Sequence, residues 1–260
     1  MTLEVPQYLG IAYRGWTWSP VAQYHPVTTA WKVQHPDGRA VYIKISAAPG
    51  YPRVLCEARR TEWASSFLPV PPVLDYGTDG QIDWLVTGAL AGINAVDARQ
   101  VMSAESLVPA LANGLRRFHE APVTDCPFDF RLDTALQHIQ RRAASGATSP
   151  ATDFHPEHAH LDVMGALTEL VRLRPSNEQL VVCHGDYCFP NVLLQDGEVT
   201  GFLDMGELGV ADRWWDLAVA TWSVSWNIGP EWENLFLTTY GIEPDNRRIA
   251  FYRLLYDLTS

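Results

Sequence analysis

Basic residues are few in this sequence of 260 residues. Lys and Arg number 19 against 30 Asp and Glu, so the formal net charge is −11 with neutral histidines. Nucleic-acid binding uses clustered Lys and Arg to neutralise phosphates, and this balance excludes a broad basic surface of that kind. We therefore expect no nucleic-acid partner. A negative field favours a small cationic ligand instead.

Cysteines and long apolar runs are also scarce. Four cysteines do not make a disulfide framework in a chain of this size. The longest uncharged stretch near the C-terminus, residues 217–230, is too short to span a bilayer. The first residues lack the basic flank and apolar run of a secretory signal. We expect a cytoplasmic protein with no membrane partner, as a monomer or a weak dimer.

Several catalytic and metal-binding patterns are missing. The sequence has no G-x4-G-K-[ST] motif and no G-x-S-x-G motif, which excludes P-loop chemistry and the nucleophile elbow of hydrolases. Cys183, His184 and Cys188 lie close together in the chain. A structural zinc site needs four ligands with paired spacings, and no second pair is present. We expect no zinc.

The first third of the chain has a pattern typical of a small β-rich unit. Short apolar runs bounded by turn residues predict strands, and one longer run before a proline-rich segment predicts a helix. The predicted strands are 30–33, 40–45, 73–75 and 84–87, and the predicted helix is 54–67.

From about residue 97 the apolar spacing becomes helical, as in the stripe Leu107, Leu111, Leu115 and Phe118. Further helices are expected at 132–144, at 157–173 and through most of 212–260, with short strands at 180–183, 192–194 and 201–203. The sequence therefore predicts an α+β protein with a small β-rich N-terminal lobe, residues 1–88, and a larger α-rich C-terminal lobe, residues 89–260.

The segment His184–Asn191 carries the most chemical information. Asp186 is followed five positions later by Asn191, and Asp204 comes thirteen residues after that. Phosphoryl transfer needs one carboxylate to orient the acceptor hydroxyl, and an amide and a second carboxylate to hold Mg²⁺ against the phosphates. Asp and Asn in hairpin loops are also ordinary turn formers, which is the alternative interpretation.

Together these segments resemble the aminoglycoside phosphotransferases, and most of all the aminoglycoside 3′-phosphotransferase (kanamycin kinase) branch. The resemblance lies in residues 182–192 and 201–218, in 125–128 and in the ending 241–255, and it extends over about 27–257. It implies a protein-kinase-like fold with ATP bound between two lobes, and Mg²⁺ as the metal. The implied activity is phosphorylation of a hydroxyl of an aminoglycoside antibiotic, which confers resistance.

The resemblance also implies roles for single residues. Asp186 would orient the substrate hydroxyl and accept its proton. Asn191 and Asp204 would ligate Mg²⁺. Lys44 would neutralise the α- and β-phosphates, and Glu57 would pair with Lys44.

Other parts of the site follow from the same resemblance. The segment expected to cover the phosphates, residues 23–29, contains no glycine, so Thr28 and Thr29 would donate hydroxyl and backbone N–H groups instead. Ala89 and Leu90, in the connector between the lobes, would meet the adenine edge through their backbone.

Two polar residues, Asp216 and His184, are interpreted as structural. Asp216 corresponds to a residue that, in kinase-like folds, accepts backbone N–H bonds from the catalytic loop. His184 is interpreted as a packed, hydrogen-bonded loop residue and not as a general base. For the ion pair of Lys44, described above, Glu62 is the alternative to Glu57.

The part that would recognise the antibiotic departs from the family pattern. Glu207 stands where the kanamycin- and neomycin-modifying relatives have Arg, and the chain ends in residues 256–260 instead of an acidic-aromatic D-E-x-F. We hypothesise that Glu207 and Asp257 bind substrate amines, with Glu157 as a further candidate, and that the accepted antibiotics differ from those of the usual 3′-enzymes. The alternative is that Glu207 is a solvated loop residue and Asp257 a surface charge on a helix.

Two other functions use the same scaffold. One is a kinase of a different small alcohol, and the other is a catalytically idle binding protein that senses a nucleotide or another ligand. Loss of Lys44, Asp186, Asn191 or Asp204 would favour the idle protein, and all four are present. The sequence therefore favours an active kinase.

Overall fold

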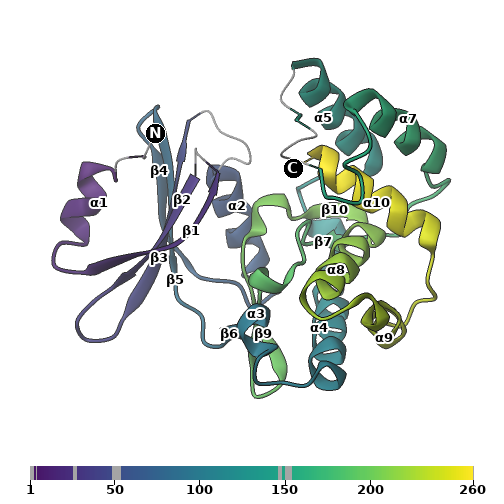
Figure 1. The fold of residues 1–260 in the computed structure, drawn as a ribbon. Coiled ribbons are helices and arrows are strands. Elements are labelled where there is room, and N and C mark those ends of the chain that lie inside the picture. Colours follow the sequence, from purple (N-terminus) through teal and green to yellow (C-terminus); the bar gives the residue numbers. More distant parts are fainter. Residues whose placement is uncertain are drawn as a thin grey trace. The chain divides into compact units, whose positions relative to one another are not determined.

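The computed structural model describes residues 3, 5–25, 28–48, 54–145, 148–149 and 154–259. The chain forms two compact units (Figure 1). Unit 1 comprises Met1–Gly92 together with Gly201–Glu207, and unit 2 comprises Ile93–Thr200 and Leu208–Ser260. The division after residue 88 stays a prediction, and it did not include the return of the chain into unit 1 at Gly201–Glu207.

Unit 1 is built on a five-stranded antiparallel sheet with the order β1-β2-β3-β5-β4. The four strands predicted in this region are present, each longer than predicted, and β1 is an additional edge strand. The strands are β1 (Thr17–His25), β2 (Thr28–Gln34), β3 (Ala40–Ala47), β4 (Val73–Thr78) and β5 (Ile82–Gly88).

Two helices accompany this sheet. Leu9 of α1 (Gln7–Ala12) is buried in one core cluster with Ile43 and Ile45 of β3. Val54 and Ala58 of α2 (Val54–Ala64) are buried in a second cluster with Leu85. The sequence did not predict α1, which buries one of its six residues and therefore shows little amphipathic pattern. Helix α2 ends at Ala64 and not at residue 67.

Unit 2 contains two small sheets. β7 (Leu180–Cys183) pairs antiparallel with β10 (Gly209–Asp212), and β6 (Ile93–Asn94), β8 (Val192–Gln195) and β9 (Glu198–Phe202) form the other sheet. β9 begins at Glu198, earlier than predicted, because Asp196 and Gly197 alone make the tight turn. Both have positive φ, 54° and 82°, as two-residue hairpin turns require.

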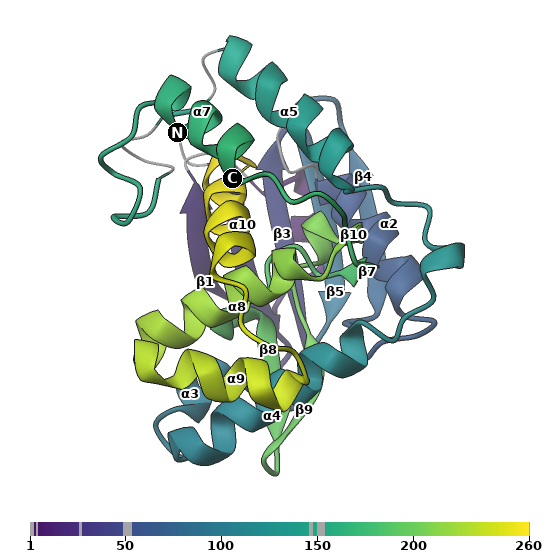
Figure 2. The ribbon, with the colours of Figure 1, turned by 90° about the vertical axis from the view of Figure 1, so that its right-hand side faces the viewer.

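Helices make up most of unit 2, and the buried stripe predicted from Leu107 to Phe118 is confirmed in α4. Figure 2 shows α8 and α10 side by side, with α9 near α4 and α8. The α-helices are α3 (Ala95–Ala98), α4 (Ala104–Phe118), α5 (Leu132–Ser145), α7 (Val163–Leu173), α8 (Trp214–Asn227), α9 (Glu233–Tyr240) and α10 (Asn246–Thr259). Short 3-10 turns cover Val123–Asp125, Phe189–Asn191, Met205–Glu207 and Pro230–Trp232.

One helix prediction in unit 2 needs correction. The helix expected from residue 157 begins at Val163, because the Asp162 side chain caps it by accepting a hydrogen bond from the Gly165 N–H. The helical tail predicted from residue 212 onward is confirmed: it consists of α8, α9 and α10, and α9 ends at Gly241, which adopts a left-handed conformation with φ 95°. The α+β class itself is confirmed. None of the helices described here is long and apolar enough to cross a membrane.

Candidate active site

In unit 1, the lysine of β3 lies between two carboxylates. Lys44 Nζ is 2.7 Å from Glu57 Oε2 and 3.0 Å from Asp204 Oδ1. The neighbouring Ile43 and Ile45 are fully buried, which anchors the strand, and the Lys44 side chain is mostly buried too. The predicted ion pair between Lys44 and Glu57 is therefore present. The alternative partner Glu62 instead accepts a hydrogen bond from Tyr76.

The electrostatics of this group follow from its burial. Desolvation alone would lower the pKa of Lys44, but Asp204 and Glu57 outweigh it and hold that pKa above its ordinary value. Desolvation raises the pKa of Glu57 to about 7, although Lys44 opposes the rise. The cluster thus holds a lysine that is charged at every physiological pH, close to a second carboxylate that is one-third exposed.

Asp204 has an unusual backbone. Its φ is 59°, in the left-handed region that non-glycine residues rarely occupy and that Asp and Asn tolerate best. The segment Gly201–Glu207 is held to the rest of unit 1 by two backbone anchors: Phe202 N–H donates to Pro69 O, and Arg60 donates to Gly206 O. Such strain is common where a site fixes a side chain.

In unit 2, the loop after β7 presents Asp186. Asn191 Nδ2 donates to both the backbone oxygen and Oδ2 of Asp186, at 3.0 and 2.8 Å. His184 is fully buried, and its Nδ1 accepts the Asp186 N–H at 3.2 Å. The prediction that His184 is a packed loop residue is confirmed.

Asp216 supports this loop from the first turn of α8. Its carboxylate accepts the backbone N–H groups of His184 and Gly185 at 2.6 and 2.8 Å, as the resemblance implied, and also contacts His119 Nε2 at 2.9 Å. His119 Nδ1 is in turn 2.7 Å from the Tyr240 hydroxyl. Asp216 is fully buried, so this network fixes the backbone that carries Asp186.

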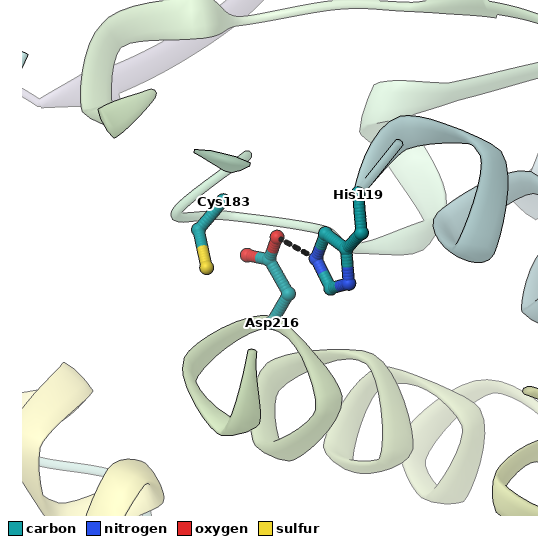
Figure 3. Close-up of side chains that lie close together, drawn as sticks. All are labelled: His119, Cys183 and Asp216. Carbon is teal, nitrogen blue, oxygen red and sulfur yellow. Dashed lines mark hydrogen bonds and ion pairs between the residues drawn. The ribbon is translucent and has the colours of Figure 1, made fainter. Parts of the chain in front are cut away.

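His119, Cys183 and Asp216 lie close enough together to resemble a metal site (Figure 3). Burial raises the pKa of the Cys183 thiol well above its usual range, and the negative charges of Asp216 and Asp212 raise it further. Cys183 Sγ donates to the backbone oxygen of Asp212, and both His119 nitrogens have hydrogen-bond partners. The three ligand atoms also fall short of the four that a structural zinc site uses. The group therefore fits a buried hydrogen-bond network.

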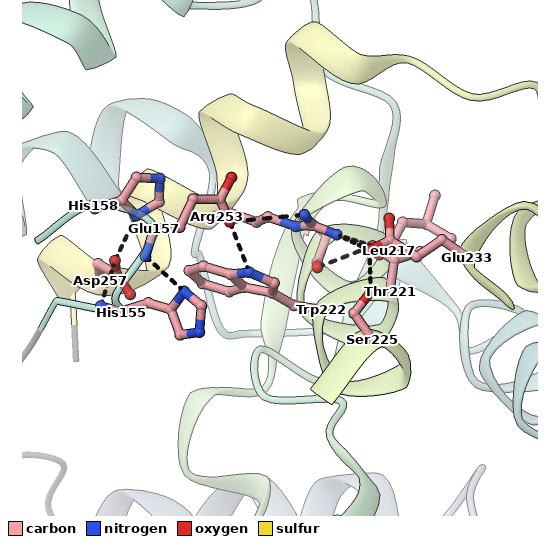
Figure 4. Close-up of polar contacts among 11 residues, drawn as sticks. His155, Glu157, His158, Leu217, Thr221, Trp222, Ser225, Glu233, Arg253 and Asp257 are labelled. Carbon is pink, nitrogen blue, oxygen red and sulfur yellow. Dashed lines mark hydrogen bonds and ion pairs between the residues drawn. The ribbon is translucent and has the colours of Figure 1, made fainter. Parts of the chain in front are cut away.

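The acidic residues predicted to bind substrate have different surroundings. Glu157 is exposed, with about half of its side-chain surface accessible, and its Oε2 accepts a hydrogen bond from Trp222 Nε1 at 3.0 Å (Figure 4). Arg253 lies 3.9 Å from the same oxygen. Glu207 is half-buried in unit 1, in the 3-10 turn Met205–Glu207.

Asp257 is buried and is not a surface charge of α10. Its Oδ2 is 2.6 Å from His158 Nδ1 and accepts the His155 N–H at 3.0 Å (Figure 4). His158 is buried as well, beside the carboxylate that it contacts. A direct contact between Asp257 and substrate stays a prediction.

The remaining predicted nucleotide contacts are also placed. Thr28 and Thr29 begin β2, opposite Ser46 and Ile45 of β3, and are half-buried. Pro26 and Val27, in the segment expected to cover the phosphates, lie outside the described residues. Ala89 is exposed and Leu90 half-buried in the connection after β5. The roles of these residues stay predictions.

Sequence reasoning missed two residues that support the site. Arg60 donates to the backbone oxygen of Gly206. It follows Glu57 by three positions on α2, and this i, i+3 spacing could have predicted that the two residues share one face of the helix. Tyr256 donates a hydrogen bond to Asp186 Oδ1 at 3.0 Å. No local sequence pattern predicts this contact, because 70 residues separate the two partners.

Unit 1 contains a buried lysine–glutamate pair beside an aspartate, and unit 2 contains an Asp–Asn loop held by a buried aspartate. These are the groups that a kinase-like phosphotransferase uses. Comparison with known proteins agrees. Residues 28–252 match the model of the phosphotransferase enzyme family. The chain is 42% identical over 208 residues to an aminoglycoside 3′-phosphotransferase of Streptomyces fradiae, covering 76% of this chain and 77% of that protein.

Solved structures show the same relationship. A crystal structure of an aminoglycoside 3′-phosphotransferase of type VIII matches with a TM-score of 0.86 and 31% identity, over 97% of both chains. The aminoglycoside phosphotransferase APH(3″)-Id of Streptomyces rimosus, in complex with ADP and streptomycin, matches with a TM-score of 0.81 and 31% identity, over 97% of this chain and 96% of that one. This chain belongs to the aminoglycoside phosphotransferase family, and its fold is kinase-like.

Proposed function

We propose that this protein is an ATP-dependent O-phosphotransferase that phosphorylates a hydroxyl of an aminoglycoside antibiotic. The observation that carries the proposal is the loop His184–Asn191, in which Asn191 donates to the Asp186 carboxylate and Asp216 accepts the backbone N–H groups of His184 and Gly185. The lysine group of unit 1 supports it, since it offers the cation that nucleotide phosphates require. The relatives act on cationic antibiotics, which suits the net charge of −11.

In this proposal Asp186 does the proton chemistry. Its carboxylate accepts a hydrogen bond from the substrate hydroxyl and takes the proton as the hydroxyl oxygen attacks the γ-phosphorus of ATP. The bond from the γ-phosphorus to the β,γ-bridging oxygen breaks, and ADP leaves with that oxygen. Positioning of this kind typically contributes about 10²–10⁴-fold to a rate.

The donor set suits Mg²⁺. Asn191 uses its Nδ2 group toward Asp186, so its amide oxygen is the atom suited to a cation, and Asp204 offers a carboxylate that is one-third exposed. Mg²⁺ prefers oxygen ligands and keeps several waters. Bound there, the ion would neutralise charge on the phosphates. Lys44, kept charged and oriented by Glu57, would hold the α- and β-phosphates, with Thr28 and Thr29 near the phosphates and the Ala89 and Leu90 backbone at the adenine.

Substrate recognition is the least family-like part. We propose that Glu157 contacts a substrate amine directly, because its carboxylate is exposed while Trp222 fixes its position. Glu207 is proposed as a second contact. Asp257 would contribute by holding the residues around Glu157, through His155 and His158, unless substrate displaces one of them.

The proposal is tested by measuring ATP turnover with kanamycin, neomycin, streptomycin and hygromycin B as separate acceptors. We expect ADP release that depends on at least one acceptor, and a product that gains one phosphate group by mass spectrometry. NMR of the product then identifies the phosphorylated hydroxyl. ADP release at the same slow rate with every acceptor and with none would contradict the proposal.

A further inference from the structure

The last helix of the chain reaches the loop that carries Asp186. Tyr256 lies in the final turn of α10, and its hydroxyl donates to Asp186 Oδ1 at 3.0 Å. The other oxygen, Oδ2, accepts from Asn191 at 2.8 Å. The two oxygens of one carboxylate are thus held by donors from two different elements of unit 2.

Two such bonds restrict the carboxylate more than either does alone. With Asn191 alone, the carboxylate could still tilt about the bonded oxygen, whereas a second donor on the opposite oxygen fixes the rotation about the Cβ–Cγ bond. An ionised carboxylate has about four lone-pair positions, so these two bonds do not use up its capacity to accept a substrate hydroxyl. Reacting groups must be held within about 0.5 Å and 10–20° of the productive geometry.

The turn that carries Tyr256 is itself anchored. Leu255 and Leu258 are fully buried, and the adjacent Asp257 is tied to His158 and to the His155 backbone. Tyr256 is half-buried, so a packed backbone supports a hydroxyl at a defined position. This arrangement suits a donor whose direction matters.

We propose that Tyr256 is a positioning residue: its hydroxyl holds Asp186 in the orientation in which it accepts the proton of the substrate hydroxyl. The inference rests on the proposed function, since it concerns the same Asp186. It assigns a role to a residue at a point where the chain departs from the family ending.

The chain offers a matched control on the same helix. Tyr252, one turn earlier, donates to the buried Asp212 at 2.9 Å, which is also a tyrosine–aspartate hydrogen bond. Tyr252→Phe removes the same chemical group from α10 without touching the Asp186 loop. A general weakening of α10 would appear in both variants.

The experiment compares Tyr256→Phe and Tyr252→Phe in steady-state kinetics on the best acceptor, with thermal unfolding measured alongside. Loss of an outer hydrogen bond that orients a metal ligand typically lowers affinity or activity by about 10–100-fold, and we expect a loss of similar size here. We expect Tyr256→Phe to lower kcat about tenfold or more, with the KM for ATP unchanged. Tyr252→Phe should lower the unfolding temperature and leave kcat close to that of the wild type.

A double-mutant cycle isolates the pair. In an Asp186→Ala background, Tyr256→Phe should have almost no further effect on the residual rate, because the group it positions is gone. Equal losses with and without Asp186, or a wild-type kcat in Tyr256→Phe, would overturn the inference. An Asp186→Ala enzyme with wild-type turnover would overturn the proposed function as well, whereas an impaired Asp186→Ala with a fully active Tyr256→Phe overturns the inference alone.

Discussion

The charge of Asp204 can be removed by substitution without a change in its backbone conformation. Asn tolerates the left-handed φ of 59° almost as well as Asp, so Asp204→Asn removes the negative charge without adding strain. An amide is a poorer ligand than a carboxylate for a hard cation. We therefore expect Asp204→Asn to weaken ATP binding in the presence of Mg²⁺ more than ATP binding without it.

Titration calorimetry with and without Mg²⁺ measures this difference. The exposed Asp196, the other described non-glycine residue with a positive φ, provides the control. Asp196→Asn should leave both affinities unchanged. Equal losses for Asp204→Asn under the two conditions would remove Asp204 from the metal site.

Substitution of Asp216 should lower stability as well as turnover, because its fully buried carboxylate supports the backbone of the Asp186 loop. Asp216→Ala would leave the N–H groups of His184 and Gly185 without their acceptor in the interior. An unsatisfied buried donor costs about 1–3 kcal/mol. We expect the free energy of unfolding to fall by roughly 3 kcal/mol, and kcat to fall with it, because the loop that presents Asp186 loses its support.

The control is Asp245→Ala. Asp245 also accepts two backbone N–H groups, those of Arg247 and Arg248, but it lies just before α10 and 44% of its side-chain surface is accessible. Water replaces its hydrogen bonds, so the cost should be about 1 kcal/mol, as for a helix cap. Chemical denaturation measures both variants. Equal losses would show that burial of Asp216 has no special importance.

At the scale of elements, the segment 154–161 before α7 carries the proposed substrate contact. Glu157→Gln keeps the shape of the side chain and removes its charge. A charge-assisted contact is worth about 1.5–3 kcal/mol, so the KM for the aminoglycoside should rise about tenfold with little change in kcat. Glu169→Gln, a half-buried acid of α7 that pairs with Arg172, is the control and should leave KM unchanged.

The same kinetics apply to Glu207→Gln and Asp257→Asn. A raised KM in either variant would support the contacts predicted from the sequence. Asp257→Asn should also lower stability, because its carboxylate is buried against His158. If the KM is unchanged in all three variants, recognition lies elsewhere on the protein.

Local patterns predicted the elements that bury one clear face. The stripe of α4 and the strands of unit 1 are of this kind. The Lys44–Glu57 pair was predicted in another way, from the resemblance to a known family. Helix α1 was missed because all of its residues except Leu9 are exposed, and strand β1 was missed because Trp18 is the one residue of 17–21 that is partly buried, so neither shows a clear period. The contacts of Asp257 with His158 and of Tyr256 with Asp186 were beyond sequence reasoning, since only tertiary packing brings such distant residues together.

For the whole molecule, the net charge of −11 predicts that salt weakens the binding of the aminoglycoside. A polycationic acceptor is drawn to an acidic protein, and the attraction weakens as the Debye length falls from about 10 Å at 0.1 M to about 3 Å at 1 M salt. We expect the KM for the aminoglycoside to rise severalfold over this range. The KM for ATP, an anion, should not rise in parallel, and a parallel rise would indicate a general effect of salt on the enzyme.

The most direct test of the account is the turnover of Asp186→Ala with the best acceptor, measured beside its affinity for ATP. We expect a loss of about 10²–10⁴-fold in kcat, since Asp186 both orients the hydroxyl and takes its proton. ATP binding should survive, because Lys44, Glu57 and Asp204 belong to unit 1. Turnover within a few-fold of the wild type would contradict the central claim.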